Sequence, residues 1–331
     1  MLTITLTSGS SFQATIGSSI LNAALQANVS VPYSCNTGRC STCKCKVLSG
    51  KTTLLHPETG LTDEEVNEGW ILSCVRTAES DLVLEVDDLA GIHLPVAKTY
   101  PCRINGINHL APDVVQVSLR LPPTAAFEFI AGQYISVIGP NGVRRSYSLA
   151  NSGFEDKMLE LHIREVEGGE MSQYWFKEAK INDLLRINGP LGTFFLRETA
   201  DIDLYFLATG TGIAPVKAML ESIIRLPLEK KPRSVSVLWG GRKPHDFYIN
   251  VADIPCEHTF IPVLSRLDEG WTGAQGYVQN VLLDLHPQWE TTAIYACGSD
   301  AMIRCAKKSL VDAGLPENRF YSDAFVSSSI A

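Results

Sequence analysis

Residues 34–45 read SCNTGRCSTCKC and place four cysteines within eleven positions. Cysteine thiolates are soft ligands, so a cluster this dense indicates a disulfide framework, a zinc site or an iron–sulfur site. The chain holds nine cysteines, an odd number, and the sequence before Arg39 lacks the Lys or Arg that begins a signal peptide. We therefore expect a cytoplasmic protein, in which stable disulfides are rare and metal binding is favoured.

The cysteine spacing distinguishes between the possible metals. Cys35, Cys40 and Cys43 follow a C-x4-C-x2-C pattern, and Cys74 lies 31 residues after Cys43. Zinc ribbons use two C-x2-C pairs and zinc fingers end in spaced histidines, and the sequence has neither pattern. The observed run is typical of plant-type [2Fe–2S] ligation, so these four cysteines are the predicted ligands. A zinc site and unliganded buried thiols are the alternatives.

The other cysteines are predicted to have no ligand role. Cys45 lies two residues after Cys43 and is expected to be a small buried side chain at the start of a strand, with metal ligation as the alternative. Cys102, Cys256 and Cys305 are expected to pack in the interior. Gly38 lies between the predicted ligands, where it would let backbone amides turn toward sulfur.

Length and charge limit the possible classes of protein. A chain of 331 residues with 45% apolar and 19% charged side chains predicts two or three globular domains. No apolar run approaches the roughly 18 residues of a membrane span. The net charge is −8, and residues 1–92 hold five basic and ten acidic side chains. This distribution argues against nucleic-acid binding and suits docking on a basic partner, although acidic side chains also serve solubility.

Hydrophobic periodicity divides the chain into three parts. Residues 1–92 predict a hairpin, one main helix behind a Ser cap and a short helix with a capping box at Thr62 and Glu65. Residues 98–198 contain six strand-like segments and one helical piece, which is typical of an antiparallel barrel. Residues 201–331 alternate strands with helices, which predicts a parallel sheet covered by helices.

Motifs in these three parts resemble the ferredoxin–NADP reductase superfamily with an N-terminal plant-type ferredoxin. The resemblance implies a multi-domain chain with a β-grasp ferredoxin domain (α+β), an antiparallel flavin-binding β-barrel and a parallel-sheet (α/β) nicotinamide domain. Beside the cysteine run, the motifs are RRSYSLAN (144–151), LHIREVEGGEMS (161–172), GPLGTF (189–194), LATGTGIAP (207–215), LWGGR (238–242) and YACGSDAMI (295–303).

The second domain is predicted to bind FAD. On a strand, Arg145 and Tyr147 share one face, where Arg can clamp a pyrophosphate and Tyr can stack on the isoalloxazine. The resemblance assigns those roles and gives Ser148 a hydrogen bond near the reactive nitrogen. Ser172 is expected as a capping hydroxyl at a helix start that favours phosphate. The further predicted cofactor-binding residues are His162, Arg164, Gly169 and Met171.

The third domain is predicted to bind the nicotinamide dinucleotide in a glycine turn between a strand and a helix. The turn lacks the third Gly of G-x-G-x-x-G and has Pro215 in the first helical turn, as the resemblance implies. Thr209 stands where the family often has Gly. The other predicted residues of this site are Gly210, Thr211, Gly212, Arg242, Cys297 and Gly298.

Two residues of the third domain are predicted to act in catalysis together with Ser148. The resemblance places Cys297 beside the nicotinamide, with a buried core cysteine as the alternative. It places Phe325 in a C-terminal aromatic region near the flavin, with a docked hydrophobic tail as the alternative. Arg and Lys recognise the 2′-phosphate of NADPH, and the candidates for this role are Arg242, Lys243 and the pair Ser265–Arg266. The resemblance nevertheless favours NADH, with NADPH possible.

We expect electrons to pass from NADH to FAD, then to [2Fe–2S] and on to a partner protein. Several stretches between the motifs are most similar to family members that serve a dehydrase of dideoxysugar synthesis. The reductase component of an aromatic-ring or hydrocarbon oxygenase is the alternative within the family. A non-enzymatic zinc-binding or redox-sensing protein is the alternative from another class. We expect a monomer with no nucleic-acid or membrane partner.

Overall fold

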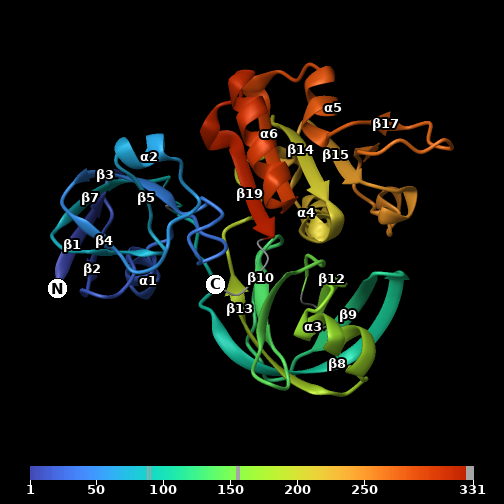
Figure 1. Cartoon of the computed structure of the whole chain (residues 1–331), viewed down its shortest axis with the longest axis horizontal. Coiled ribbons are helices and arrows are strands. Elements are labelled where there is room, and N and C mark those ends of the chain that lie inside the picture. The colour runs from blue at the N-terminus through green and yellow to red at the C-terminus, as the bar shows by residue number, and fades with distance from the viewer. Residues whose placement is uncertain (88, 90, 154–156, 326–331) are drawn as a thin grey trace. The chain divides into compact units, whose positions relative to one another are not determined.

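The structure is a computed structural model, and it describes residues 1–331 except 88, 90, 154–156 and 326–331. The chain divides into two compact units, residues 1–95 with 323–331 and residues 96–322. Figure 1 shows the elements of both units. In the part of the chain that is described, no helix combines the length and apolarity needed to cross a membrane.

The first unit is built on a five-stranded sheet of order β2-β1-β7-β3-β5, in which β1 and β7 are parallel. Its strands are β1 (Leu2–Leu6), β2 (Ser11–Ala14), β3 (Lys44–Ser49), β5 (Trp70–Leu72) and β7 (Leu82–Glu85), and β4 (Thr52–Leu54) pairs separately with β6 (Arg76–Ala78). The predicted hairpin is confirmed, because β1 and β2 pair antiparallel.

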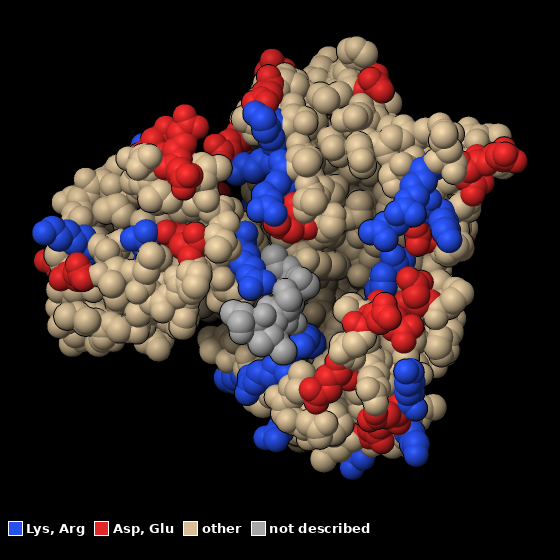
Figure 2. Space-filling view, in the orientation of Figure 1, with Lys and Arg blue, Asp and Glu red and all other residues tan. Residues whose placement is uncertain are grey.

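The helices of the first unit begin at the predicted caps. The Ser19 hydroxyl accepts a hydrogen bond from the Asn22 amide at 3.2 Å, and α1 runs Ile20–Gln26. Its buried face includes Ile20 and Leu21, and burying each such side chain contributes roughly 1.5–3 kcal/mol. Helix α2 (Asp63–Asn67) carries the predicted capping box. Figure 2 shows acidic side chains gathered over α2, whose first turn is entirely acidic.

The second unit contains an antiparallel sheet of order β11-β10-β13-β8-β9-β12. Its strands are β8 (Lys98–Ala111), β9 (Val114–Arg120), β10 (Tyr134–Ile138), β11 (Arg144–Ser148), β12 (Met158–Arg164) and β13 (Leu184–Leu191). A bridge between Leu149 and Leu161 joins the two edges, which closes the predicted barrel. The predicted helical piece is α3 (Glu170–Gln173) followed by a π-helix (Tyr174–Glu178).

A further sheet has the order β17-β16-β15-β14-β18-β19, and its strands from β17 to β18 pair parallel. Its strands are β14 (Asp203–Thr209), β15 (Ser234–Gly241), β16 (Thr259–Leu264), β17 (Ala274–Gln275), β18 (Thr292–Ser299) and β19 (Phe320–Phe325), and its helices are α4 (Ile213–Ile224), α5 (Val278–Asp284) and α6 (Asp300–Asp312). The strand order reverses between β14 and β18, and ligands of parallel sheets bind at such a switch point. The three predicted sheets are therefore all present.

Candidate functional site

The four predicted cluster cysteines lie in the first unit as two pairs. The Cys35 amide donates to the Cys40 sulfur at 3.5 Å, and the two thiols share a hydrogen bond. The Cys43 and Cys74 sulfurs lie 3.3 Å apart. A [2Fe–2S] cluster has four cysteine ligands, two for each of its irons. Two thiol pairs fit that group better than they fit a single zinc ion.

In each pair, the hydrogen bond between the two thiols lowers the pKa of one of them. A hydrogen bond from Cys40 lowers the pKa of Cys35 to about 5, although burial opposes the shift. The Cys43 thiol likewise lowers the pKa of Cys74. Cys40 and Cys43 keep their protons, because these shared hydrogen bonds and burial raise the pKa of both thiols. Thiolate is the form that binds metal, so the pairs are chemically suited to ligation.

Backbone amides in the cysteine loop point toward cysteine sulfurs, as we expected from the presence of Gly38. The Thr37 amide donates to the Cys35 sulfur at 3.4 Å. Gly38 has φ +73°, and a Cβ there would lie 2.5 Å from the Pro57 carbonyl oxygen. Only glycine fits this position without strain, and hydrogen bonds to ligand sulfur are a means of tuning cluster potential.

The remaining cysteines divide by burial. Cys45 lies in β3 and is buried, and burial raises the pKa of its thiol to about 12. The prediction that Cys45 is a buried side chain is confirmed. Cys102 is also buried and Cys256 is half-buried. Cys305 is exposed, so the prediction that it packs in the interior is wrong. The buried face of α6 consists of Ile303, Ala306 and Leu310 instead.

The predicted flavin motif occupies β11. Arg145 and Tyr147 are half-buried on one face of the strand, and Ser148 at its end is buried. The Tyr147 hydroxyl accepts a hydrogen bond from Trp175 Nε1 at 3.0 Å, and the rings meet edge to face. Burial raises the pKa of Tyr147 to about 12, so its phenol stays neutral at physiological pH.

The loop after β12 differs from the prediction in its cap. Gly169 is the N-cap of α3, and no side chain caps this helix. The Ser172 hydroxyl instead accepts a hydrogen bond from the Val166 amide at 2.9 Å, which closes the turn. Met171 is buried. The prediction of Ser172 as the capping hydroxyl is wrong because Ser172 lies inside the first helical turn.

His162 on β12 makes contacts that sequence reasoning missed. One ring nitrogen lies 3.2 Å from the Tyr248 hydroxyl and the other lies 2.8 Å from Glu160 Oε1. Lys217 Nζ lies 3.4 Å from the same carboxylate oxygen and 2.6 Å from Glu221 Oε1. These side chains form a polar network, in which both ring nitrogens of His162 already have partners.

Arg164 at the end of β12 reaches the glycine turn of the parallel sheet. Its guanidinium pairs with Asp113 at 3.3 Å and with Asp246 at 3.5 Å. A Cβ on Gly210 would lie 3.7 Å from Arg164 Nη1. The structure therefore brings this residue of the predicted flavin site beside the predicted nicotinamide turn.

The glycine turn packs directly on the end of β18. Gly210–Gly212 forms a 3-10 helix between β14 and α4, with Pro215 in the first turn of α4. A Cβ on Gly212 would lie 2.2 Å from the Cys297 carbonyl oxygen. Cys297 is fully buried, and Gly298 has φ +134°. The predicted residues of the nicotinamide site are thus gathered at the switch point of the sheet.

Two other predicted site residues, Arg242 and Phe325, lie outside the glycine turn. Arg242 follows β15, and its amide donates to Asp246 Oδ2 at 2.7 Å, as the Lys243 amide does at 3.1 Å. Although burial opposes the shift, these bonds lower the pKa of Asp246. Phe325 ends β19 and is 39% exposed, while the residues that follow it in the predicted aromatic tail lie outside the described part.

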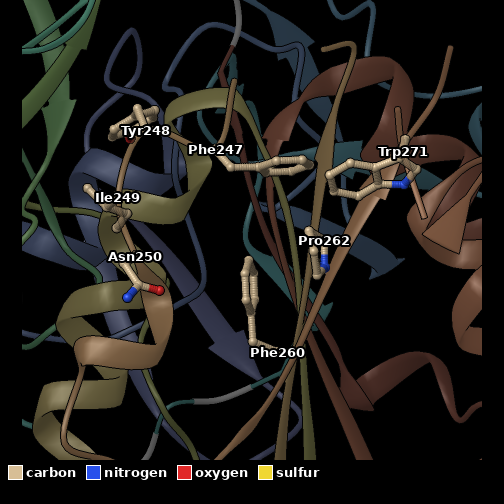
Figure 3. A pocket seen from close by; sticks show the side chains of 7 residues that line it. All are labelled: Phe247, Tyr248, Ile249, Asn250, Phe260, Pro262 and Trp271. Atoms are coloured by element: carbon tan, nitrogen blue, oxygen red, sulfur yellow. The ribbon is translucent and has the colours of Figure 1, made fainter. Parts of the chain in front are cut away.

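An aromatic hollow of about 370 Å³ opens beside β16, and the sequence analysis did not predict it. Figure 3 shows the seven residues that line it: Phe247, Tyr248, Ile249, Asn250, Phe260, Pro262 and Trp271. The rings of Phe247 and Trp271 stack at 5.5 Å. Four of the lining residues are consecutive (247–250), and the others come from β16 and from Trp271.

The fold and the sites define a class of protein, the iron–sulfur flavoprotein reductases, and the chain belongs to it. Residues 4–79 match the 2Fe-2S iron-sulfur cluster binding domain, residues 101–196 the oxidoreductase FAD-binding domain and residues 206–308 the oxidoreductase NAD-binding domain. The protein is therefore an oxidoreductase whose cofactors are a [2Fe–2S] cluster, FAD and a nicotinamide dinucleotide.

Particular relatives extend over nearly the whole chain. The CDP-6-deoxy-L-threo-D-glycero-4-hexulose-3-dehydrase reductase of Yersinia pestis is 43% identical over 316 residues, 94% of both chains. The phenol hydroxylase P5 protein of Acinetobacter pittii is 32% identical over 93% of this chain and 89% of its own. The crystal structure of the Amycolatopsis cytochrome P450 reductase GcoB matches with a TM-score of 0.79 at 30% identity, over 99% of this chain and 100% of the other.

Proposed function

We propose that this protein uses NADH to reduce a partner enzyme, and that the partner is a hexulose 3-dehydrase of dideoxysugar synthesis. The observation that carries the proposal is the 43% identity to the Yersinia pestis dehydrase reductase over 94% of both chains. The relatives named as dioxygenase, hydroxylase or monooxygenase components are 29–32% identical, which supports the oxygenase alternative less strongly. We further propose domain bounds of 1–92, 98–198 and 201–331, a monomeric state and a cytoplasmic location.

When bound, FAD and the cluster would supply the redox chemistry, namely two-electron exchange with the dinucleotide and one-electron transfer to the partner. In our proposal the two thiol pairs hold the cluster. Arg145 holds the flavin pyrophosphate, and Tyr147 covers its ring. Because the Tyr147 phenol donates or accepts without ionising, it adds no charge beside the flavin. Ser148, buried at the end of β11, orients the reacting edge of the ring.

The polypeptide also positions the dinucleotide. The turn at Gly210–Gly212 lies at the switch point, and Arg164, whose charge is balanced by Asp113 and Asp246, lies beside it. We propose that Cys297 borders the nicotinamide through its backbone, because its side chain is fully buried. Phe325 keeps its proposed role as the aromatic cover of the flavin.

A negative charge beside the basic residues supports NADH over NADPH. Asp246 is held ionised by the amides of Arg242 and Lys243, at 2.7 and 3.1 Å. A carboxylate at this position repels a 2′-phosphate and offsets the attraction of the two basic side chains. We therefore propose NADH as the preferred donor.

An anaerobic titration of the purified protein with NADH, followed in the visible spectrum, tests the electron path. We expect the flavin absorbance and then the iron–sulfur band to bleach at near-stoichiometric NADH, and a parallel NADPH series to require a large excess. A colourless protein that takes up neither flavin nor iron on reconstitution would contradict the proposal.

A second assay identifies the partner. The reduced protein is mixed with a hexulose 3-dehydrase and its substrate, or with the terminal component of an aromatic oxygenase, and cytochrome c reduction serves as the control. Product formation with the dehydrase alone supports the proposal. Turnover with the oxygenase alone would establish the alternative instead. Light scattering and cell fractionation test the monomeric state and the location.

A further inference from the structure

A short segment, residues 57–60, lies against the loop that carries Cys35, Cys40 and Cys43. The amides of Thr59 and Gly60 both donate to the Gly38 carbonyl at 2.9 Å. The Ser41 hydroxyl donates to the carbonyl of Gly60. Residues 57–60 therefore fix the middle of the cysteine loop through backbone groups.

The same segment holds the turn that carries Cys74, through the side chain of Glu58. Glu58 Oε1 accepts a hydrogen bond from the Leu72 amide at 2.6 Å. Arg76 donates from Nε to both carboxylate oxygens at 3.1 Å and from Nη2 to Oε2 at 2.8 Å. Leu72 and Arg76 flank Cys74 by two residues on either side. One carboxylate thus binds both ends of the turn.

The burial of this ion pair calls for a reason other than stability. The Glu58 side chain is 4% exposed and the Arg76 side chain 16%. Removing two charges from water costs about as much as their attraction returns, so a buried pair is weak evidence for stabilisation. Such pairs are retained in some proteins because they specify one geometry. Here the geometry is the approach of Cys74 to the cysteine loop.

We propose that Glu58, together with Arg76, is a positioning residue for the cluster, and that it sets both the approach of the two thiol pairs and the charge around them. This inference rests on the proposed assignment of the four cysteines as cluster ligands. Neither residue touches the reacting atoms in this proposal. Glu58 acts through the Leu72 amide, and Arg76 keeps the buried carboxylate compensated.

Removing the charge of Glu58 and removing the charge of Arg76 should shift the reduction potential of the cluster in opposite directions. Glu58→Gln keeps an oxygen for the Leu72 amide but leaves the Arg76 charge uncompensated, which favours the more negative, reduced cluster and raises the potential. Arg76→Gln leaves the carboxylate uncompensated and lowers the potential. The double variant E58Q/R76Q should return close to the wild-type value. A purely structural role would not produce shifts of opposite sign.

The rate at which the protein loses iron measures how firmly Glu58 holds the cysteine ligands in place. In Glu58→Ala the Leu72 amide loses its acceptor, and hydrogen bonds to charged groups are strong enough that loss of iron to a chelator should accelerate about tenfold or more. The electron paramagnetic resonance spectrum of the dithionite-reduced variant should also change in its g-values. Glu68→Gln, which removes the same charge from an exposed position of the first unit, is the matched control and should match the wild type.

The outcomes separate this inference from the proposed function. Iron-loaded wild type with unchanged potential, spectrum and iron retention in the Glu58 and Arg76 variants overturns the inference alone. Potential shifts of the same sign in both single variants also overturn it. A wild type that binds no iron and sulfide refutes the cluster assignment and this inference with it.

Discussion

The first prediction concerns how much the partly buried carboxylate of Glu160 contributes to the folding stability of the second unit. Its carboxylate lies 2.8 Å from His162 Nε2 and 3.4 Å from Lys217 Nζ. Although burial opposes the shift, these partners lower the pKa of Glu160 from 4.5 to about 2. The substitution Glu160→Gln keeps the shape and the hydrogen bond but removes the charge.

The pKa shift sets the expected magnitude. A tenfold change in proton affinity corresponds to about 1.4 kcal/mol, so the lowered pKa corresponds to roughly 3 kcal/mol of folding free energy at neutral pH. The Glu160 side chain is 21% exposed, so solvent screens it only in part. We expect the free energy of unfolding of E160Q at pH 7 to fall by about 2–3 kcal/mol. Asp312→Asn, in an exposed ion pair with Lys308, should cost less than about 1 kcal/mol.

The pH dependence gives the sign of the effect. A carboxylate whose pKa is lowered by folding stabilises the protein above its unfolded-state pKa, and this contribution is lost as the pH falls. The difference between wild type and E160Q should be constant between pH 6 and 8. At pH 4 it should be about 1 kcal/mol smaller, because most unfolded chains are then protonated.

Urea unfolding followed by tryptophan fluorescence measures these differences. The ring of Trp239 is buried and lies 5.2 Å from that of Tyr248, whose hydroxyl contacts His162. Cluster absorbance, recorded in the same samples, reports the first unit separately and should not shift. A stability of E160Q within 0.5 kcal/mol of wild type at pH 7 (about the scatter of surface substitutions), or a difference that grows at pH 4, would refute the reasoning.

Three further predictions concern the cofactor sites. Thr209→Val removes the acceptor of the Ser299 amide, which lies at 3.1 Å, and should raise KM for NADH about 2–10-fold, whereas Thr209→Ser should stay near wild type in steady-state kinetics. Asp246→Asn removes the charge beside the basic residues and should raise the ratio of kcat/KM for NADPH over NADH about fivefold or more, and an unchanged ratio would contradict the role of this carboxylate. Cys74→Ser should lose most of its iron by elemental analysis while NADH still bleaches its flavin, and full iron content would remove Cys74 from the ligand set.

Local patterns predicted much of the fold because their physical cause is local. The Ser19 cap and the Thr62–Glu65 capping box act within one helical turn, and both are present as predicted. The β1–β2 hairpin follows from alternation across a short turn. Cysteine spacing predicted the thiols that the structure brings into two pairs, since three of the four come from one loop and only Cys74 is distant in sequence.

Contacts between distant residues could not be predicted in the same way. The bond between Glu58 and the Leu72 amide spans 14 residues, and the contact between His162 and Tyr248 spans 86. Each joins segments whose proximity depends on the whole fold, so no local pattern in the sequence predicts it. The prediction for Ser172 was wrong for a different reason: a Ser hydroxyl can also bond to a nearby backbone amide from inside the first helical turn, as it does here to the Val166 amide.

Backbone packing around the glycine turn explains why Gly212 and Gly298 are glycines, without reference to a ligand. A Cβ on Gly212 would lie 2.2 Å from the Cys297 carbonyl oxygen, and a Cβ on Gly298 would lie 2.7 Å from the Thr209 carbonyl oxygen. The two glycines therefore allow the backbone of the turn after β14 to approach the end of β18 closely. The Thr209 hydroxyl accepts a hydrogen bond from the Ser299 amide at 3.1 Å, which strengthens this contact. Close backbone packing at the switch point therefore requires these glycines whether or not a ligand binds, and residue types that preserve the packing preserve the turn.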